Sequence, residues 1–344
     1  MGLKATIKDV AKLAGVSFKT VSRVINNESN VKAETLEKVQ HAINTLNYQP
    51  NQAARNLAAV QSYAIGYVYD NPNAYYIIDM QKGLLEACHE RNYELLIYPC
   101  DASKSNIAHT LLGMISRSKL AGLVLSPPLS EMPEVLAQIA ESGVPFVGVV
   151  SGDAPDIPQG RWVCIDDRLA AERIVDHLIG LGHKRIGFLS GDHSHRSTLE
   201  REQGYLDALA KHGLANDQAL RFNGQYAFNS GVAGMKTLLS LPTPPTAVFA
   251  CNDEIASGAL FHARLHGLNV PQQLAIAGFE NSPFSLQTWP PITTAAQPTS
   301  DIAKQAGDLL ISTIQERRTH KDREKPKTPR YFCPELIIRD STGK

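Results

Sequence analysis

One short stretch near the N-terminus, TIKDVAKLAGVSFKTVSRVIN at residues 6–26, limits most strongly what this chain can fold into. Ile7 and Val10 begin an apolar face with helical spacing, and Gly15 can end that helix with a positive φ. Ser17 then stands where a second helix needs an N-cap, and the residues after it give this helix one buried stripe and one polar, basic side. Two short helices joined by a turn containing Gly are typical of the helix-turn-helix, whose second helix enters the major groove of DNA.

The polar side of the predicted second helix supplies the candidate DNA contacts. Phe18 and Lys19 lie at its start and should reach base edges, and Arg23, one turn further on, can bond a guanine with both arms of its guanidinium. We expect the other contacts, most of them to phosphates, from Ser17, Thr20, Ser22, Asn26, Thr6, Ile7, Tyr48 and Asn51. Taken alone, residues 6–26 are equally compatible with an ordinary helical hairpin whose polar face is solvated.

The residues that follow favour the DNA-reading interpretation. A third amphipathic helix is predicted at 33–46, and the turn LNYQPN and a short helical pattern containing AARNLA come next. These blocks, in this order and at this spacing, resemble the N-terminus of the lac repressor (LacI/GalR) family of bacterial transcription regulators. The resemblance implies a helix-turn-helix domain at 1–50, a hinge at 51–61 and an effector-binding and dimerisation domain at 62–344.

The hinge carries one further candidate contact. A helix at residues 51–58 would be shorter than the ~12–15 residues that hold helicity alone in water, so we expect it to fold only when two copies meet on DNA. Leu57 would then wedge between base pairs in the minor groove, as the resemblance also implies. The alternative is that Leu57 packs on the domain that follows.

Charge and length agree with a small head on a larger body. The formal net charge of the 344 residues is zero, but residues 1–61 contain eight Lys or Arg and only four Asp or Glu. A basic head and an acidic remainder suit phosphate binding by the head alone. The length exceeds the ~250–300 residues of one hydrophobic core, so more than one domain is expected.

From Tyr63 onward, short apolar runs alternate with helical patterns. The expected strands are at 64–69, 93–99, 122–126, 146–150, 185–190, 247–251, 274–279 and 335–339, and the expected helices at 76–91, 107–116, 169–181, 198–212, 230–239 and 254–266. Such alternation predicts parallel sheets covered by helices on both faces, and so many strands need two sheets. We therefore predict an N-terminal all-α helix-turn-helix domain plus an α/β bilobal domain with two doubly wound parallel sheets. The resemblance implies the same periplasmic-binding-protein-like architecture.

The chain is expected to pass between the two lobes at two places, near Val163–Asp167 and near Thr293–Gln297. The charged stretch at 316–327 reads as a solvated connection before the last strand. With the resemblance as guide, the N-subdomain comprises about 62–165 and 294–328, and the C-subdomain about 166–293 and 329–344.

Polar residues follow most of the expected strands, and Asp70, Ser151, Asn252 and Glu280 are among them. In open α/β sheets, ligands bind beyond the carboxyl ends of the strands. Carboxylates, amides and a guanidinium can chelate adjacent hydroxyls, whereas no glycine-rich phosphate loop follows any strand. The sequence thus favours a carbohydrate over a phosphate as the ligand.

The resemblance assigns individual positions to this ligand site. Ser197 and Arg201 match the family segment whose arginine reaches ligand hydroxyls, and Glu280 replaces the Asp that is commoner in its motif, so no relative's ligand can be transferred. The full candidate set is Asp70, Tyr75, Tyr76, Ser197, Arg201, Tyr226, Asn252, Asp253, Glu280 and Gln297. Alternatives stay open: a surface ion pair for Arg201, a helix cap for Asp253 and simple packing for the two adjacent tyrosines.

Other classes of function are disfavoured. Five cysteines form no CxxC pair, which predicts reduced thiols and no zinc site. No signal peptide and no membrane span of ~18 apolar residues is recognisable, so we expect a cytoplasmic, nucleoid-associated bacterial protein. Asp192, His193 and His195 share one loop, but it contains no nucleophile elbow, metal spacing or phosphate loop, so we expect no enzymatic activity, metal or cofactor.

Together these observations predict a dimeric, ligand-controlled repressor of carbohydrate-utilisation genes. Its expected partners are double-stranded operator DNA of pseudo-palindromic sequence, a small sugar-like effector and a second copy of the chain, with no membrane. The alternative is a sugar-binding module without a role in DNA regulation. That alternative is opposed by residues 1–58 and by the missing signal peptide.

Overall fold

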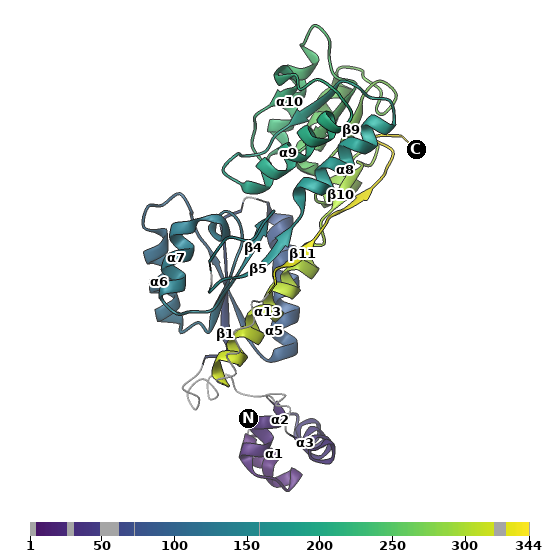
Figure 1. Ribbon diagram of the computed structural model, residues 1–344. Helices are drawn as coiled ribbons and strands as arrows, with labels where there is room; N and C mark the ends of the chain where they lie inside the picture. The colour runs from purple at the N-terminus through teal and green to yellow at the C-terminus, as the bar shows by residue number, and fades with distance from the viewer. Residues whose placement is uncertain are drawn as a thin grey trace.

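The computed structural model describes residues 5–25, 31–48, 62–71, 73–157, 159–319 and 328–343. Figure 1 shows a helical head near the N-terminus and two α/β lobes, with α5 and α13 side by side along the first lobe. Among these residues no helix combines the length and the apolar character that a membrane span requires.

The head contains three helices, α1 (Ile7–Ala14), α2 (Phe18–Ile25) and α3 (Ala33–Thr45). Gly15 ends α1 with a φ of +68°, and its N–H donates to Ala11 O. Ser17 Oγ accepts a hydrogen bond from Thr20 N at 3.2 Å and so caps α2. The predicted helix-turn-helix is therefore confirmed. Its small core consists of Val10, Ala11, Ala14, Val21, Val24, Val39 and Ala42.

The first lobe is built on a six-stranded sheet in which all neighbouring strands are parallel. Their order is β11 (Arg330–Phe332), β5 (Arg161–Ile165), β4 (Phe146–Ser151), β3 (Gly122–Leu125), β1 (Ala64–Tyr69) and β2 (Glu94–Pro99). Helices α5 (Ala74–Arg91) and α13 (Thr299–Arg318) cover one face, and α6 (Ile107–Ser118) and α7 (Pro133–Glu141) cover the other. A single 3₁₀ turn, η1 (Leu129–Glu131), precedes α7.

The alternation of side chains along β4 shows why both faces are covered. Val147 and Val149 pack with α5 and α13, whereas Phe146 and Val150 pack with α6 and α7. Because both faces of the strand are apolar, each needs a layer of helices. The α5–α13 contact is especially close, since a Cβ on Gly83 would lie 1.9 Å from a backbone oxygen of α13.

The second lobe has a four-stranded parallel sheet with one continuous core. The strand order is β7 (Arg221–Phe222), β6 (Ile186–Leu189), β8 (Ala247–Ala250) and β9 (Ala275–Ala277). Helix α8 (Asp167–Gly180) packs on α9 (Arg196–Lys211), and α10 (Phe228–Leu239) on α11 (Asp253–Leu265). The remaining elements are η2 (Gln218–Leu220), α12 (Pro283–Gln287) and the antiparallel pair β10 (Thr294–Ala296) and β12 (Glu335–Ile337). The predicted bilobal fold class is confirmed.

Three segments join the lobes. β5 runs almost directly into α8, residues 297–298 separate β10 from α13, and residues 333–334 separate β11 from β12. Because β11 pairs with β5, residues 330–332 belong to the first sheet and not to the second lobe. Because β10 pairs with β12, residues 294–296 stay beside the second lobe. Both pairings shift the subdomain boundaries expected from the sequence by a few residues.

Candidate functional site

A cavity lies between the two lobes, beyond the carboxyl ends of the strands. About 530 Å³ of space lies between its walls, and this figure includes open solvent at its mouth. Its lining consists of Asn71, Asn73, Tyr76, Pro127, Ser151, Ile165, Asp167, His195, Ser197, Arg201, Tyr226, Glu280 and Gln297. Hydroxyl, amide and carboxylate groups predominate, and residues from both lobes contribute. We call this space the main cavity.

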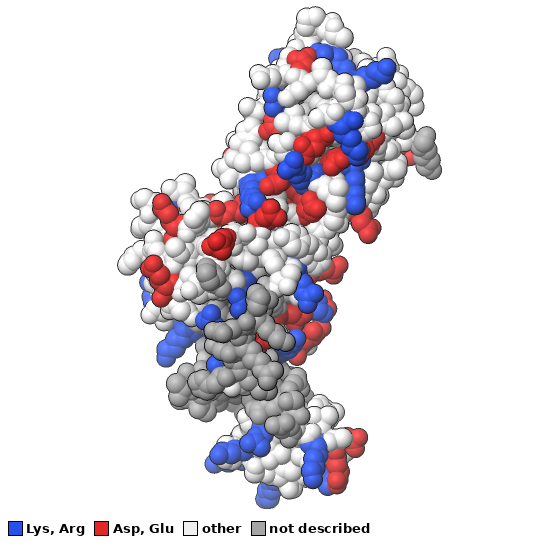
Figure 2. All heavy atoms as spheres, in the orientation of Figure 1, with Lys and Arg blue, Asp and Glu red and all other residues white. Residues whose placement is uncertain are grey.

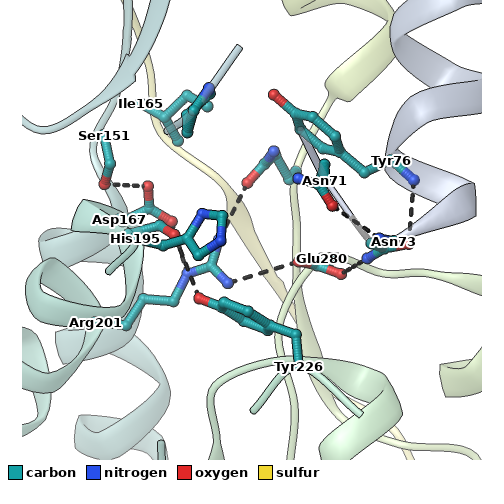
Figure 3. A pocket seen from close by; sticks show the side chains of 13 residues that line it. Asn71, Asn73, Tyr76, Ser151, Ile165, Asp167, His195, Arg201, Tyr226 and Glu280 are labelled. Carbon is teal, nitrogen blue, oxygen red and sulfur yellow. Dashed lines mark hydrogen bonds and ion pairs between the residues drawn. The ribbon is translucent and has the colours of Figure 1, made fainter. Parts of the chain in front are cut away.

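Arg201 occupies the centre of the main cavity, between two carboxylates (Figure 3). Its Nε donates to Asp167 Oδ1 at 2.8 Å, and its Nη1 lies 3.7 Å from Glu280 Oε1. The side chains of Arg201 and Asp167 are only 4% and 1% exposed. Burial disfavours the charged guanidinium, but Asp167, Tyr226, Cys251 and Glu280 together outweigh this and raise the pKa of Arg201.

The rest of the Arg201 guanidinium is also engaged. Nη1 donates to Cys251 O at 2.8 Å, and Nη2 lies 3.5 Å from Gln297 Oε1. The ring of Phe279 lies under the guanidinium, 3.8 Å from its central carbon. The alternative of a surface ion pair is therefore wrong, because Arg201 is a buried, multiply bonded residue of the cleft.

Glu280 reaches the cavity from a strained loop. Its φ is +99° and that of Asn281 is +57°, a region that costs a non-glycine residue about 1–3 kcal/mol. The loop is held by Glu280 N, which donates to Ala295 O at 2.8 Å. Glu280 Oε2 accepts from Asn73 Nδ2 at 2.8 Å, which joins the two lobes. Burial raises the pKa of Glu280 to about 7.

Asn252 and Asp253 do not line the cavity, and Asp253 supports the Glu280 loop. Asp253 accepts hydrogen bonds from Thr294 Oγ1 at 2.6 Å and from Ser282 N at 2.7 Å, and burial raises its pKa to about 7. Asn252 caps α11 by accepting from Ile255 N at 2.9 Å. Asp253 is thus a positioning residue for the segment that presents Glu280.

Another carboxylate, that of the half-buried Glu131 in η1, connects the lobes beside the main cavity. It accepts from Ser151 N at 3.1 Å in its own lobe and from Arg196 N, at the start of α9, at 3.3 Å. Burial raises the pKa of Glu131 to about 7. Ser151 Oγ donates to Asp167 Oδ2 at 2.6 Å, a further bond between lobes. Sequence reasoning missed this cluster.

Tyr226 forms an aromatic wall of the main cavity. Its hydroxyl is 2.8 Å from Thr198 Oγ1 and 3.3 Å from Ser197 Oγ, and burial raises its pKa. The His195 ring meets the Tyr226 ring edge-on, with centroids 5.7 Å apart. Burial lowers the pKa of His195. The wall therefore presents an apolar face with polar groups at its rim, a surface suited to a sugar ring.

A side cavity adjoins the main one and shares Asn73, Tyr76, Glu280 and Gln297 with it. Tyr75 lines only this side cavity, where it contacts Phe284 of α12 edge-on at 5.7 Å.

The structure brings together six of the ten predicted ligand-site residues in the main cavity: Tyr76, Ser197, Arg201, Tyr226, Glu280 and Gln297. Asp70 lines neither cavity, because its carboxylate accepts from Ala102 N at 2.8 Å and ties two loops together. The lining residues outside the predicted set are Asn71, Asn73, Pro127, Ser151, Ile165, Asp167 and His195. Asn71 and Pro127 lie two residues after a strand, and Ser151, which the sequence analysis marks as a strand-end residue, is the last residue of β4.

The candidate DNA surface lies on the head. Phe18 is 56% exposed, and Lys19 and Arg23 are also exposed on α2. Figure 2 shows Lys and Arg side chains on the surface of the head in this view. An apolar ring exposed beside basic side chains is costly in water and suits contact with a thymine methyl.

The predicted phosphate-binding residues surround this surface. The hydroxyls of Ser17 and Thr20 lie 2.9 Å apart, and Thr6 Oγ1 donates to Asp9 Oδ2 at 2.7 Å at the start of α1. Ser22 is half-buried, and Ile7 and Tyr48 pack partly against the head core. Asn26, Asn51 and Leu57 lie outside the described residues.

No arrangement suited to enzymatic catalysis is found in the loop around His193. His193 Nε2 is 3.1 Å from both Ser190 Oγ and Glu202 Oε2, so one ring nitrogen makes both contacts and cannot relay a proton between them. Within the described ranges, no group of three His, Cys, Asp or Glu residues could hold a metal ion.

Comparison with known proteins agrees with this division into head and body. Residues 6–51 match the family model of bacterial regulatory proteins, lacI family, and residues 175–342 match the periplasmic binding protein-like domain. The probable HTH-type transcriptional repressor ExuR of Bacillus subtilis (strain 168) is 31% identical over 98% of both chains. Catabolite control protein A of Priestia megaterium is 33% identical over 91% of this chain and 94% of its own. These relatives are regulators and not enzymes.

Solved structures give the same result. The lac repressor dimer bound to operator and the anti-inducer ONPF superimposes with a TM-score of 0.76 at 26% identity, covering 99% of this chain and 100% of that one. A complex of the transcriptional regulator CelR with cellobiose gives a TM-score of 0.71 at 28% identity, covering 98% and 99%.

Proposed function

Because this chain belongs to the lacI family of bacterial regulatory proteins and is a DNA-binding transcription regulator, we propose that it represses carbohydrate-utilisation genes under the control of a sugar-like effector. The observation that carries the proposal is the combination, in one chain, of an exposed α2 and an interlobe cavity centred on Arg201. Neither alone would connect DNA binding to a small molecule. We also place its activity at the nucleoid, in the bacterial cytoplasm.

Exposed positions on α2 support the roles proposed for three head residues. Phe18, Lys19 and Arg23 would read base edges from the start of α2. Thr6, Ser17, Thr20, Ser22 and Tyr48, with Asn26 and Asn51, would set the register on the phosphates, Ile7 would make a further contact with DNA, and Leu57 would enter the minor groove. In this division residues 1–50 form the reading domain, residues 51–61 the hinge, and residues 62–344 the domain that binds the effector and the partner copy.

Exposed apolar side chains support assembly as a homodimer on a pseudo-palindromic operator. Trp289 is 76% exposed beside α12, and Phe261, Leu265 and Leu286 are also exposed on α11 and α12. In the first lobe, exposed apolar residues lie on α5 and on β2, which is an edge strand. Such surfaces are uncommon on monomers and typical of protein interfaces. A two-fold dimer would present two α2 helices to two half-sites.

The effector would act through the contacts that join the lobes. Ser151 to Asp167, Asn73 to Glu280 and Glu131 to Arg196 all bridge them, and most of these residues line the main cavity. A ligand whose hydroxyls replace one partner in some of these hydrogen bonds would stabilise one arrangement of the lobes relative to another. Only this difference in affinity between the two arrangements can change the affinity for DNA.

The test compares the full chain with a variant that lacks residues 1–61. Operator fragments are selected from random DNA by the full chain, and binding is followed by gel retardation with and without sugars. We expect the full chain to retard the selected fragments, a sugar to change that retardation, and the shortened chain to retain sugar binding alone. Retardation by the shortened chain, or sugar binding without any effect on DNA binding, would contradict the proposal.

A further inference from the structure

The charged groups that face the cleft determine which ligands it can accept. Among the described residues that line the main cavity, Arg201 is the only Lys or Arg, and it faces the carboxylates of Asp167 and Glu280. The described lining of the side cavity adds Asp79 and Asp301 and contains no Lys or Arg. Once Glu280 is ionised, above its pKa of about 7, negative charge therefore exceeds positive charge along the described walls of both cavities.

Arg201 is already neutralised by its neighbours before a ligand arrives. Its Nε is bonded to Asp167 Oδ1 at 2.8 Å, its Nη1 to Cys251 O at 2.8 Å, and the Phe279 ring covers one face of the guanidinium. Only Nη2 has a weak partner, Gln297 Oε1 at 3.5 Å. A carboxylate or phosphate that approached Nη2 would come close to the carboxylates of Asp167 and Glu280, which already balance the guanidinium charge.

The other groups that reach the main cavity are suited to hydroxyls. Asn71 and Ser197 supply an amide and a hydroxyl, and Gln297 Oε1 lies at the edge of the guanidinium. His195 would be a cation only when protonated, and its burial lowers its pKa, so it is neutral near pH 7. An anionic ligand would thus meet amides, hydroxyls and carboxylates, and no cation that is free to neutralise it.

We propose that this cleft takes an uncharged polyhydroxylated ligand, a neutral sugar or glycoside, and excludes sugars that carry a carboxylate or a phosphate. The inference rests on the proposed function and narrows the effector to one chemical class. Two acidic residues and one already paired arginine would leave no compensating charge for an anionic substituent in the main cavity.

Matched pairs of sugars test this selectivity. The full chain is titrated by thermal shift and calorimetry at pH 7.5 and constant ionic strength with glucose and galactose, and with their charged counterparts glucuronate, glucose 6-phosphate and galacturonate. We expect at least one neutral sugar to raise Tm, and its charged counterpart to bind at least about tenfold more weakly. A charged sugar that binds as tightly as its neutral counterpart, or charged sugars as the only ligands, would overturn the inference and leave sugar sensing intact. No shift with any sugar would overturn the proposed sugar sensing, and this inference with it.

Two Glu→Gln variants test whether negative charge in the cleft causes the discrimination against charged sugars. Glu280→Gln removes one negative charge from the main cavity and keeps an oxygen that can accept from Asn73 Nδ2. We expect it to reduce the discrimination against the charged sugar by several-fold. Glu134→Gln is the control, because it removes the same charge at an exposed position of α7 outside both cavities, and it should leave the discrimination unchanged.

The outcome of the variants decides between charge and shape. Circular dichroism verifies that each variant is folded, and Asp301→Asn, at an exposed position of the side cavity, replaces Glu280→Gln should that variant not fold. An unchanged ratio of neutral to charged sugar affinity in the cavity variant, or an equal change in the control, would show that the charge of the cleft is not what excludes anions.

Discussion

The head and the cleft use their charged side chains in opposite ways. In the described part of the head, Lys19 and Arg23 are exposed on α2, and the acidic residues Asp9, Glu34 and Glu37 are exposed as well. In the cleft, Arg201 and Asp167 are 4% and 1% exposed and bonded to each other. Exposed cations on a DNA-binding surface stay hydrated and are available to the phosphates. Buried charges in a ligand cleft, by contrast, need partners within the protein before any ligand binds. The difference predicts that charge removal destabilises the body and weakens binding by the head.

The largest effect is expected from Arg201→Ala. It leaves Asp167 buried without its cation, so the free energy of unfolding of the body should fall by about 3–5 kcal/mol in urea titrations. Arg168→Ala removes a comparable Arg–Asp pair on the surface, where the Arg168 side chain is 51% exposed, and should cost about 0–1 kcal/mol. Equal losses in the two variants would mean that burial does not distinguish these pairs.

The second-largest effect concerns pH, because the free energy of unfolding of the body should depend on pH differently from that of the head. Glu131, Asp253 and Glu280 have pKa values raised to about 7 in the folded protein, so between pH ~4.5 and 7 they keep protons that the unfolded chain has lost. Their favourable contribution is complete below pH ~4.5 and is lost as pH rises through 7, by about 1.4 kcal/mol per pH unit for each such carboxyl. Urea midpoints of the body should therefore fall from pH 5 to pH 8.

The head should not follow that trend, because its described carboxylates are exposed. Glu131→Gln provides the check within the body, since an amide at this position cannot titrate and should flatten the slope. If the free energy of unfolding of the body rose between pH 5 and pH 7, the raised pKa values of Glu131, Asp253 and Glu280 would be contradicted.

A smaller effect, on DNA affinity and not on stability, is expected from Arg23→Ala. Loss of a bidentate contact to guanine should weaken operator binding by roughly 1–3 kcal/mol and relax sequence preference at one position in each half-site. Binding to selected and random fragments is compared by fluorescence anisotropy at fixed salt. An equal loss on both kinds of DNA would assign Arg23 to a phosphate and not to a base.

The smallest effect is expected from Ser17→Ala. It removes the oxygen that accepts from Thr20 N and should destabilise the head by about 1 kcal/mol. Ser22→Ala lies inside α2, serves as the control, and should change head stability by less, measured by circular dichroism of an isolated fragment of residues 1–48. If the Ser17→Ala and Ser22→Ala heads were equally stable, the role of Ser17 as N-cap of α2 would be contradicted.

The head could be predicted almost completely because its signals are local. Gly15 and Ser17 determine where α1 ends and α2 begins, and both act within a few residues of the chain. Most strands of the two sheets were equally accessible, since short apolar runs between helical patterns mark them, but β5, β7 and β11 were not predicted. Helix α13 was not predicted, although Ile302, Ala306 and Leu310 form a buried stripe, because small residues dilute its amphipathic pattern.

The cleft could be predicted only in part because its contacts join distant segments. Asp167 was missed since β5 was not recognised as a strand, and the residues after it were not inspected as a strand end. Asp253 was recognised as a polar residue at a helix start, but its role depends on Thr294, which the fold brings to it from another segment. Arg201 was found through the family resemblance. Its burial and its four polar partners follow only from the tertiary structure.

Helix α13 has a mechanical consequence. Thr299 and Asp301 at its N-terminal end line the side cavity, and at its other end Arg318 donates to Ser62 O and lies over the Tyr63 ring at 4.8 Å. A helix of 20 residues is about 30 Å long, and its close contact with α5 makes the pair a stiff strut. A tilt of the cleft end of this helix pair would therefore also move Ser62 and Tyr63, the first described residues of the body.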